Sequence, residues 1–138
     1  MKIVFAGTPE IAARALSLIS EKHQVELVIT MPDAPVGRKR VLTPSPVAQT
    51  ADALGIPVLK TQKLDAAARA RIESSQAELA IVVAYGAMIN SESLALLPWW
   101  NLHFSILPNH RGATPLQHSM ITGTDANRGL RLMMAQVW

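Results

Sequence analysis

Three polar residues alternate along one short segment of the sequence: Asn101, His103 and Ser105. Side chains two apart on a strand share a face, so these groups would line one cleft while Leu102 and Phe104 pack behind them. An amide can donate a hydrogen bond to an oxyanion, and histidine can relay protons because it titrates near neutral pH. The alternatives are an edge strand with one solvated face and, for His103 alone, a structural histidine.

A second group of residues with chemical potential is the basic triplet Arg38-Lys39-Arg40, in a chain of net charge +3. It lies between Met31 and Pro46, a stretch with too many prolines for a helix or a central strand, which predicts a surface loop. Clustered cations suit the neutralisation of RNA phosphates. The other interpretation is an ordinary solvated basic patch.

The elements that must position these residues alternate between strand and helix. Residues 2–6 read as a buried strand, Thr8-Pro9-Glu10 as the start of a helix with Thr8 as cap, and residues 25–29 as a second strand. The apolar run 79–84 is typical of a central parallel strand. One α/β domain over residues 1–138 is therefore expected, with a doubly wound, mostly parallel sheet of the Rossmann-like kind.

Further signals complete this pattern. Ser45-Pro46 predicts a helix that Gly55 ends, and Asp65 caps a third helix. The remaining expected elements are helices at 91–97 and 114–123, a short strand at 56–59, a strand at 100–104 and a last strand at 130–134.

Ligands of such sheets bind at the carboxyl ends of the strands. Gly7-Thr8-Pro9 lacks the later glycines of a dinucleotide fingerprint, so a nicotinamide cofactor is not expected there. Tyr85-Gly86 has two interpretations. The pair forms an aromatic wall with close backbone approach to a planar ligand, or it is a core tyrosine followed by a turn glycine.

The composition excludes some classes of protein. The chain has no cysteine, so it has neither a disulfide framework nor a thiolate zinc site, and no metal is expected. The first apolar stretch, residues 3–6, is too short for a signal peptide or a membrane span. We expect a soluble, cytoplasmic protein.

The segment from Asn101 to Gly112, Asn-x-His-x-Ser-Ile-Leu-Pro-x-x-Arg-Gly, resembles the signature of the 10-formyltetrahydrofolate-dependent formyltransferases. Residues 3–9, 32–38, 44–47 and 82–86 are similar to the methionyl-tRNA formyltransferase branch of that family. The resemblance implies transfer of a formyl group from 10-formyltetrahydrofolate to the α-amino group of methionine on initiator tRNA, an early step of protein synthesis.

The resemblance also implies roles for individual residues. Asn101 would donate to the oxyanion of the tetrahedral intermediate, while His103 would help to hold it and relay protons. Residues 31–46 correspond to a loop that engages the acceptor end of the tRNA, with Arg38 as its matching arginine. The residues implied are Tyr85, Gly86, Ser105, Ile106, Leu107 and Pro108 for the folate, and Arg38, Lys39 and Arg40 for the tRNA.

The sequence departs from the family pattern at its end. The aspartate of the family's Leu-Asp-Thr-Gly type motif would follow Trp138, and neither Gln136 nor Asp125 replaces it. By resemblance the chain is truncated and lacks the family's C-terminal barrel domain. We therefore expect little activity from residues 1–138 alone, and self-association through residues 130–137, where the shortened sheet would expose an edge.

Two other functions remain open at this point. Another folate-dependent formyltransferase, acting on an amino sugar nucleotide or on glycinamide ribonucleotide, would share Asn101, His103 and the Ser105 loop. A catalytically inactive remnant would keep the fold and bind folate or RNA. The basic, proline-rich loop favours the tRNA-specific branch over the other formyltransferases.

Overall fold

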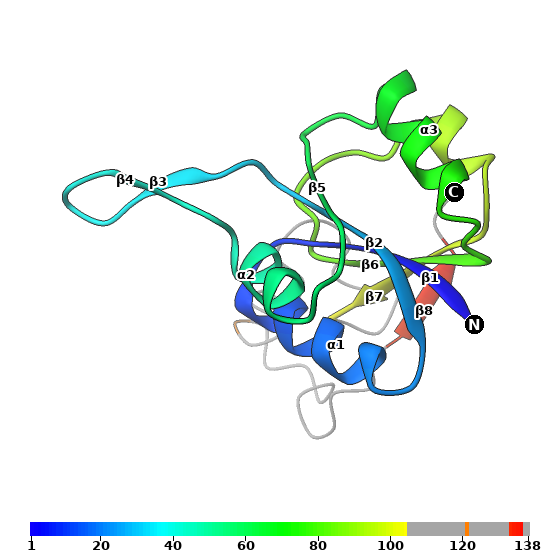
Figure 1. Ribbon diagram of the computed structural model, residues 1–138, viewed down its shortest axis with the longest axis horizontal. Coiled ribbons are helices and arrows are strands. Elements are labelled where there is room, and N and C mark those ends of the chain that lie inside the picture. Colours follow the sequence, from blue (N-terminus) through cyan, green and yellow to red (C-terminus); the bar gives the residue numbers. More distant parts are fainter. Residues whose placement is uncertain (105–120, 122–132, 137–138) are drawn as a thin grey trace.

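A six-stranded sheet forms the centre of the described structure, a computed structural model that describes residues 1–104, 121 and 133–136 (Figure 1). The strand order is β5-β2-β1-β6-β7-β8. The first five of these pair in parallel, and β8 is antiparallel to β7. The strands are β1 (Lys2–Gly7), β2 (Gln24–Thr30), β5 (Val58–Lys60), β6 (Leu79–Val83), β7 (Trp99–His103) and β8 (Met133–Gln136). The prediction of a doubly wound, mostly parallel sheet is confirmed.

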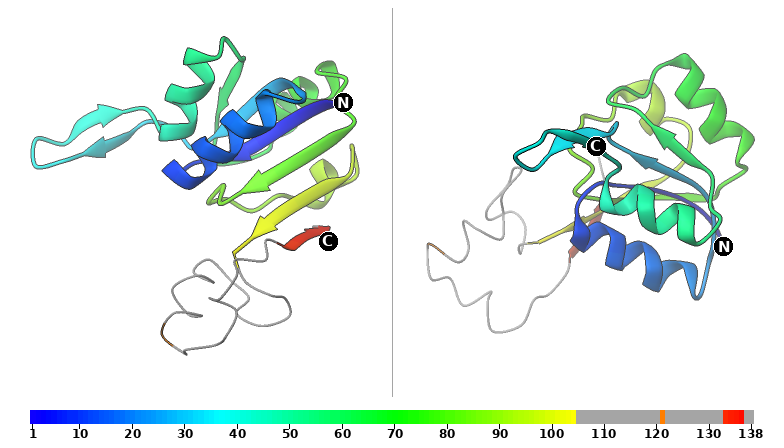
Figure 2. Two further views of the ribbon diagram at one scale, coloured as in Figure 1. Left: turned by 90° about the horizontal axis from the view of Figure 1, so that it is seen from below. Right: turned by 60° about the vertical axis from the view of Figure 1, so that its left-hand side comes forward.

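Helices cover both faces of this sheet (Figure 2). One face carries α1 (Glu10–Ser20) and α2 (Pro46–Ala53), and the other carries α3 (Ala66–Ser74) and α4 (Ser91–Leu94). Ser45 and Asp65 cap α2 and α3 as predicted, because their side chains accept hydrogen bonds from the amides of Ala48 and Ala68. Helix α4 is shorter than the predicted span of 91–97.

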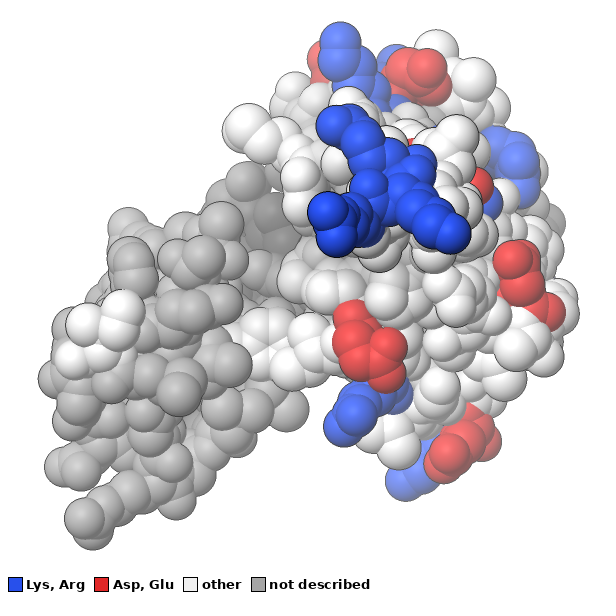
Figure 3. Space-filling model, turned by 90° about the vertical axis from the view of Figure 1, so that its left-hand side faces the viewer, with Lys and Arg blue, Asp and Glu red and all other residues white. Residues whose placement is uncertain are grey.

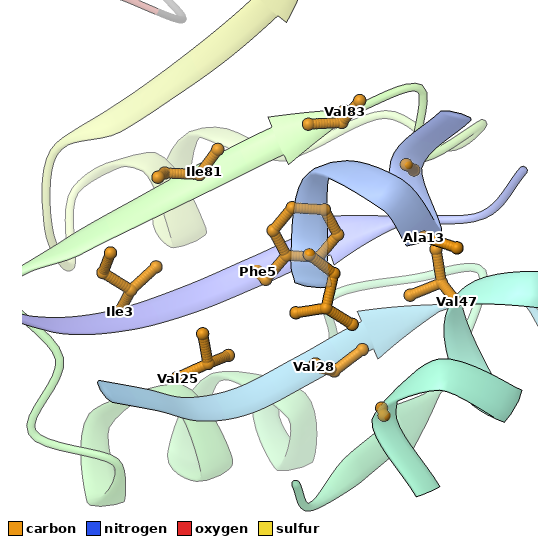
Figure 4. Packing of buried hydrophobic residues seen from close by; sticks show 11 residues of the cluster. Ile3, Phe5, Ala13, Val25, Val28, Val47, Ile81 and Val83 are labelled. Carbon is orange, nitrogen blue, oxygen red and sulfur yellow. The ribbon is translucent and has the colours of Figure 1, made fainter. Parts of the chain in front are cut away.

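The two faces of β1 enter two separate cores. Ile3 and Phe5 pack with α1 and α2, whereas Val4 and Ala6 pack with α3 (Figure 4 shows the first cluster). This alternation follows from the two-residue period of a strand that is covered on both faces. Gly7 ends the strand where α1 lies closest: an added Cβ would be 2.8 Å from the Ala12 Cβ.

The proline-rich stretch forms an ordered arm rather than a simple loop. It contains a two-stranded antiparallel ribbon, β3 (Ala34–Val36) and β4 (Val41–Thr43), which projects from the body of the molecule (Figure 1). The prediction of a surface location is confirmed. The prediction of a loop is wrong for β3 and β4, which form a ribbon within this stretch. Each strand of such a ribbon has an outward edge, where a proline such as Pro35 is tolerated.

Two further predictions concern the ends of the chain. The last strand was expected at 130–134 and is found at Met133–Gln136. The helix expected at 114–123 lies outside the described residues, apart from Ile121. None of the helices in the described part has the length and apolar character needed to cross a membrane.

Candidate active site at the carboxyl ends of the strands

The ends of β1 and β6 meet at the topological switch point of the sheet. From β1 the chain crosses toward β2 over one face, and the strands on the other side of β1 are reached by crossing the opposite face, so a crevice opens where the order reverses. The Thr8 hydroxyl donates a hydrogen bond of 2.7 Å to the Tyr85 carbonyl and joins the two strand ends. The prediction that Thr8 caps α1 is wrong, because its hydroxyl bonds across the sheet instead. Pro9 occupies the N-cap position and makes no side-chain hydrogen bond there.

The turn after β6 has an unusual backbone. Ala84 and Gly86 have positive φ angles of 47° and 89°. At Gly86 an added Cβ would meet only the Met31 side chain, at 3.9 Å, so the backbone is accessible on this side. Close backbone approach to a ligand, one of the two interpretations of this pair, is compatible with that geometry.

The side chain of Tyr85 belongs to the core. It is only 2% exposed, and its hydroxyl donates to the Thr61 carbonyl at 2.6 Å. Burial raises the pKa of Tyr85 to about 12, because the charged phenolate would lose its hydration. The ring is thus not an exposed aromatic wall, and the alternative of a core tyrosine is the one found.

Strand β7 carries the polar residues expected to perform chemistry. Its register pairs Trp99 with Ala80 and Asn101 with Val82, which places Asn101 and His103 on the face that α3 and α4 cover. Leu102 packs against the cluster on the opposite face. The predicted alternation is confirmed for Asn101 and His103, although the strand begins one residue earlier than expected. Both polar side chains are half-buried.

Buried contacts at both ends of β7 hold this arrangement. Trp99 is 1% exposed, and its indole Nε1 donates to the Ser93 carbonyl at 2.9 Å. Phe104 packs against the α1 side beside Leu102. The remaining members of the predicted folate-binding loop, Ser105, Ile106, Leu107 and Pro108, lie outside the described residues.

The base of the arm is fastened to the same edge of the sheet. Thr30 at the end of β2 and Ser45 before α2 are joined by a buried hydrogen bond of 2.6 Å between their hydroxyl oxygens. Asp33 forms an ion pair with Lys60 at the end of β5, with 2.6 Å between Oδ1 and Nζ. The ribbon therefore leaves and re-enters the body at a fixed place next to the strand ends.

The three predicted tRNA-contacting residues form the tip of this arm. Gly37 and Arg40 have positive φ angles, and the Arg40 amide donates to the Gly37 carbonyl at 3.1 Å, which closes the turn between β3 and β4. Arg38, Lys39 and Arg40 are all exposed. Figure 3 shows their cationic groups gathered on one projecting surface, and none of the ion pairs found in the described residues involves them.

A pocket that sequence reasoning missed lies between the arm and the end of β1. Its volume is about 210 Å³. The walls are mainly apolar and include Thr8, Pro9, Met31, Pro32, Pro44 and Pro46. The signal in the sequence was the recurrence of proline at both ends of the arm, but only the strand pairing brings these prolines next to Pro9.

The described residues hold no cluster of three or more His, Asp or Glu side chains that would bind a metal ion. The functional groups near this edge are instead the Asn101 amide, the His103 imidazole and the accessible backbone at Gly86. The tip of the arm adds the three cations of residues 38–40. Such groups suit the transfer of an acyl-type group through hydrogen bonding and proton movement.

The chain is similar to known formyl transferases over nearly all of its length. Residues 1–137 match the family described as formyl transferase. A methionyl-tRNA formyltransferase from Clavibacter sepedonicus is 53% identical over 127 residues, which cover 89% of this chain and 41% of that protein. The corresponding protein from Arthrobacter sp. (strain FB24) is 45% identical and covers 99% of this chain and 45% of its own length. The chain thus spans less than half the length of these curated relatives.

Solved structures share the fold at low sequence identity. A phosphoribosylglycinamide formyltransferase from Bacillus halodurans superposes with a TM-score of 0.69 at 14% identity, covering 88% of this chain and 66% of that one. A sugar N-formyltransferase from a Shewanella species gives a TM-score of 0.55 at 12% identity, covering 99% and 56% of the two chains. At these identities the likeness concerns the fold alone.

Proposed function

Because the chain belongs to the formyl transferase family, we propose that it catalyses formyl transfer from 10-formyltetrahydrofolate to the α-amino group of methionyl-initiator tRNA. The supporting observation is the arm: it presents three exposed cations at its tip and is fastened at the ends of β2 and β5, on the same edge of the sheet as the end of β7. An RNA acceptor requires phosphate contacts away from the reacting amine, and a projecting basic ribbon supplies them. This role assigns the protein to the cytoplasm, where translation begins.

The residues on β7 suit the chemistry of this reaction. When bound, the folate supplies a formyl group whose carbon is attacked by the amine. The Asn101 amide is suited to donate to the formyl oxygen as negative charge develops there, and the His103 imidazole to take the proton that the attacking nitrogen releases. The bond between the formyl carbon and the folate nitrogen then breaks, and His103 is suited to return the proton to that nitrogen as tetrahydrofolate leaves. Because Asn101 and His103 lie on the same face of the strand, one reacting centre beside that face would meet both side chains, which supports these roles.

The edge near Gly86 suits a folate. The backbone after β6 is accessible there, because an added Cβ would meet only the Met31 side chain, and the crevice of the switch point lies beside it. We assign Gly86 and the backbone of Tyr85 to one side of the folate site, with Ser105, Ile106, Leu107 and Pro108 as its other side. In this assignment the Tyr85 ring supports the turn from below rather than touching the folate.

A formylation assay with three acceptors tests the proposal. An active form of the protein is supplied with 10-formyltetrahydrofolate and, in turn, methionyl-initiator tRNA, an amino sugar nucleotide and glycinamide ribonucleotide. We expect product only with the tRNA. Formylation of either small acceptor in preference to the tRNA would assign the chain to another branch of the family. Folate and RNA binding without product from any acceptor would indicate a binding protein.

A further inference from the structure

The geometry points to the apolar pocket at the base of the arm as the binding site for the 3′-terminal nucleobase of the RNA acceptor. This inference rests on the proposed function, since it assigns a part of the proposed substrate to a cavity that neither the strand chemistry nor the basic tip uses. The pocket lies between the end of β1 and residues 31–46, and its volume is about 210 Å³.

The size and lining of the pocket limit what it can hold. Sites for drug-sized ligands usually have volumes of about 300–1,000 Å³, so this pocket is too small for a whole folate and suits a single ring system. The prolines and Met31 offer apolar surface, and no cationic side chain lines the pocket. A phosphate would lose its hydration there without compensation. A flat base, by contrast, would gain from burying its faces against the proline rings and the Met31 thioether.

The position of the pocket relative to β7 distinguishes two parts of the acceptor. Neighbouring strands lie about 4.8 Å apart, so the ends of β1 and β2 are about 10 and about 14 Å from the end of β7, which is two and three strands away. A methionyl side chain reaches only about 7 Å from its amine, which is too short. The nucleobase of the esterified nucleoside lies roughly 10 Å from that amine. With the amine at His103, the reach of the base therefore matches this separation better than the reach of the methionyl side chain does.

The arm connects this pocket with the phosphate-binding tip. Ala34, Val36 and Thr43 of the ribbon line the pocket, and the strands continue from there to Arg38, Lys39 and Arg40. An acceptor strand whose last base enters the pocket would extend its backbone along a surface that ends in three cations. The charge of the arm thus complements an RNA whose terminal nucleobase is held in the pocket where the arm joins the body of the molecule.

The register of the ribbon supplies a matched pair of variants. Ala34 is exposed and lines the pocket, so Ala34→Trp should fill it without disturbing the core. Leu42 pairs with Pro35 and so points to the opposite face of the same ribbon, where it is 68% exposed; Leu42→Trp is the control. Met31→Ala is a second test, because it removes an apolar contact instead of adding bulk.

The experiment measures binding rather than turnover. Affinities of the wild type and the three variants are determined for an uncharged RNA hairpin with a single-stranded 3′-adenosine, and for the same hairpin with an abasic 3′-terminal nucleotide. We expect removal of the base to weaken wild-type binding about tenfold. Ala34→Trp and Met31→Ala should weaken binding of the intact RNA and respond little to base removal. Leu42→Trp should behave as the wild type.

Two results would overturn the inference and leave the proposed function standing. In the first, the wild type binds both hairpins equally well. In the second, Ala34→Trp weakens the binding of a third RNA, which carries an amide-linked 3′-methionine, but does not weaken the binding of the uncharged hairpin. The occupant of the pocket would then be the methionyl side chain. Failure of the wild type to bind any of these RNAs would overturn the proposed function together with the inference.

Discussion

Asn101 and His103 share a face because successive side chains of β7 point to opposite faces of the sheet. The sequence already showed that Asn101 and His103 are two positions apart and that Leu102 and Phe104 are apolar. The environment of Tyr85 was not visible. Whether a tyrosine after a strand points into a crevice or into the core depends on the backbone on both sides of it, here with positive φ at Ala84 and Gly86.

Replacing His103 tests the chemistry assigned to β7. In an active form of the protein, His103→Ala should lower turnover by about 10²–10⁴-fold, the usual effect of losing a general acid–base group, with little change in folate affinity. Single-turnover formylation and folate titration measure the two quantities. Trp100→Phe is the control, because Trp100 points to the opposite face of the same strand and is 45% exposed. Near-normal turnover of His103→Ala would show that this face does not carry the reaction.

The buried phenol gives a second expectation, at high pH. Because the pKa of Tyr85 is raised from 10.0 to about 12 in the folded state, the unfolded state ionises first as the pH rises. The free energy of unfolding should therefore be unaffected by this group below about pH 10 and should fall between about pH 10 and 12. Tyr85→Phe should lose this pH-dependent component.

Tyr85 is the only tyrosine in the chain, which makes the measurement direct. Absorbance of the phenolate reports its titration in the folded protein, and denaturant unfolding at several pH values reports the stability change. A phenolate that appears with a midpoint near pH 10 in the folded protein would mean that the ring is solvated, contrary to its burial and to its hydrogen bond with Thr61.

At the level of elements, local signals predicted the helix starts better than the arm. Ser45 and Asp65 cap their helices as expected, because capping depends on a few adjacent residues. The hydroxyl of Thr8 forms its bond with Tyr85, which is distant in sequence, and no local pattern indicated that choice. The ribbon within residues 31–46 was missed because its prolines argue against central strands, whereas an isolated ribbon accommodates them.

The basic tip leads to a prediction about RNA affinity. Replacing Arg38 by Ala together with Lys39→Gln and Arg40→Gln should weaken tRNA binding and reduce its salt dependence by roughly one unit of slope for each lost phosphate contact. Folate binding should not change. Filter binding or fluorescence titration over a series of salt concentrations measures both the affinity and the slope.

A variant of equal charge change controls for long-range electrostatics. Arg14, Lys22 and Arg71 lie on or after the helices and away from the arm, so neutralising these three removes the same net charge. We expect this control to retain most of the affinity and the salt slope. If both triple variants behaved alike, net charge and not the arm would determine RNA binding.

For the whole molecule, the mostly parallel character of the sheet followed from the alternation of strands and helices, but neither the strand order nor the direction of the last strand did. The apolar residues near 130–134 indicated a strand, and its antiparallel pairing with β7 depends on a connection that the sequence pattern does not define. In the described part of the sheet, β8 pairs on one side only, with β7. An edge of this kind can pair with a second chain.

We therefore expect the chain of residues 1–138 to self-associate as its concentration rises. Sedimentation velocity over a range of concentrations should show dimers or larger species. A charge at the edge opposes such pairing, so Ala135→Lys should shift the equilibrium toward monomer. A wild-type chain that stays monomeric at every concentration would remove β8 from any interface.

The hydrogen bond between Thr30 and Ser45 makes the arm an independent module. It joins the two residues that flank the arm, so the sheet and α2 are held together whatever lies between them. Lengthening or shortening a loop between fixed ends changes the closure entropy only slowly, by about 0.6 kcal/mol for each doubling of length. We therefore expect that residues 31–44 can be exchanged by grafting a ribbon of another length while the sheet and α2 keep their fold.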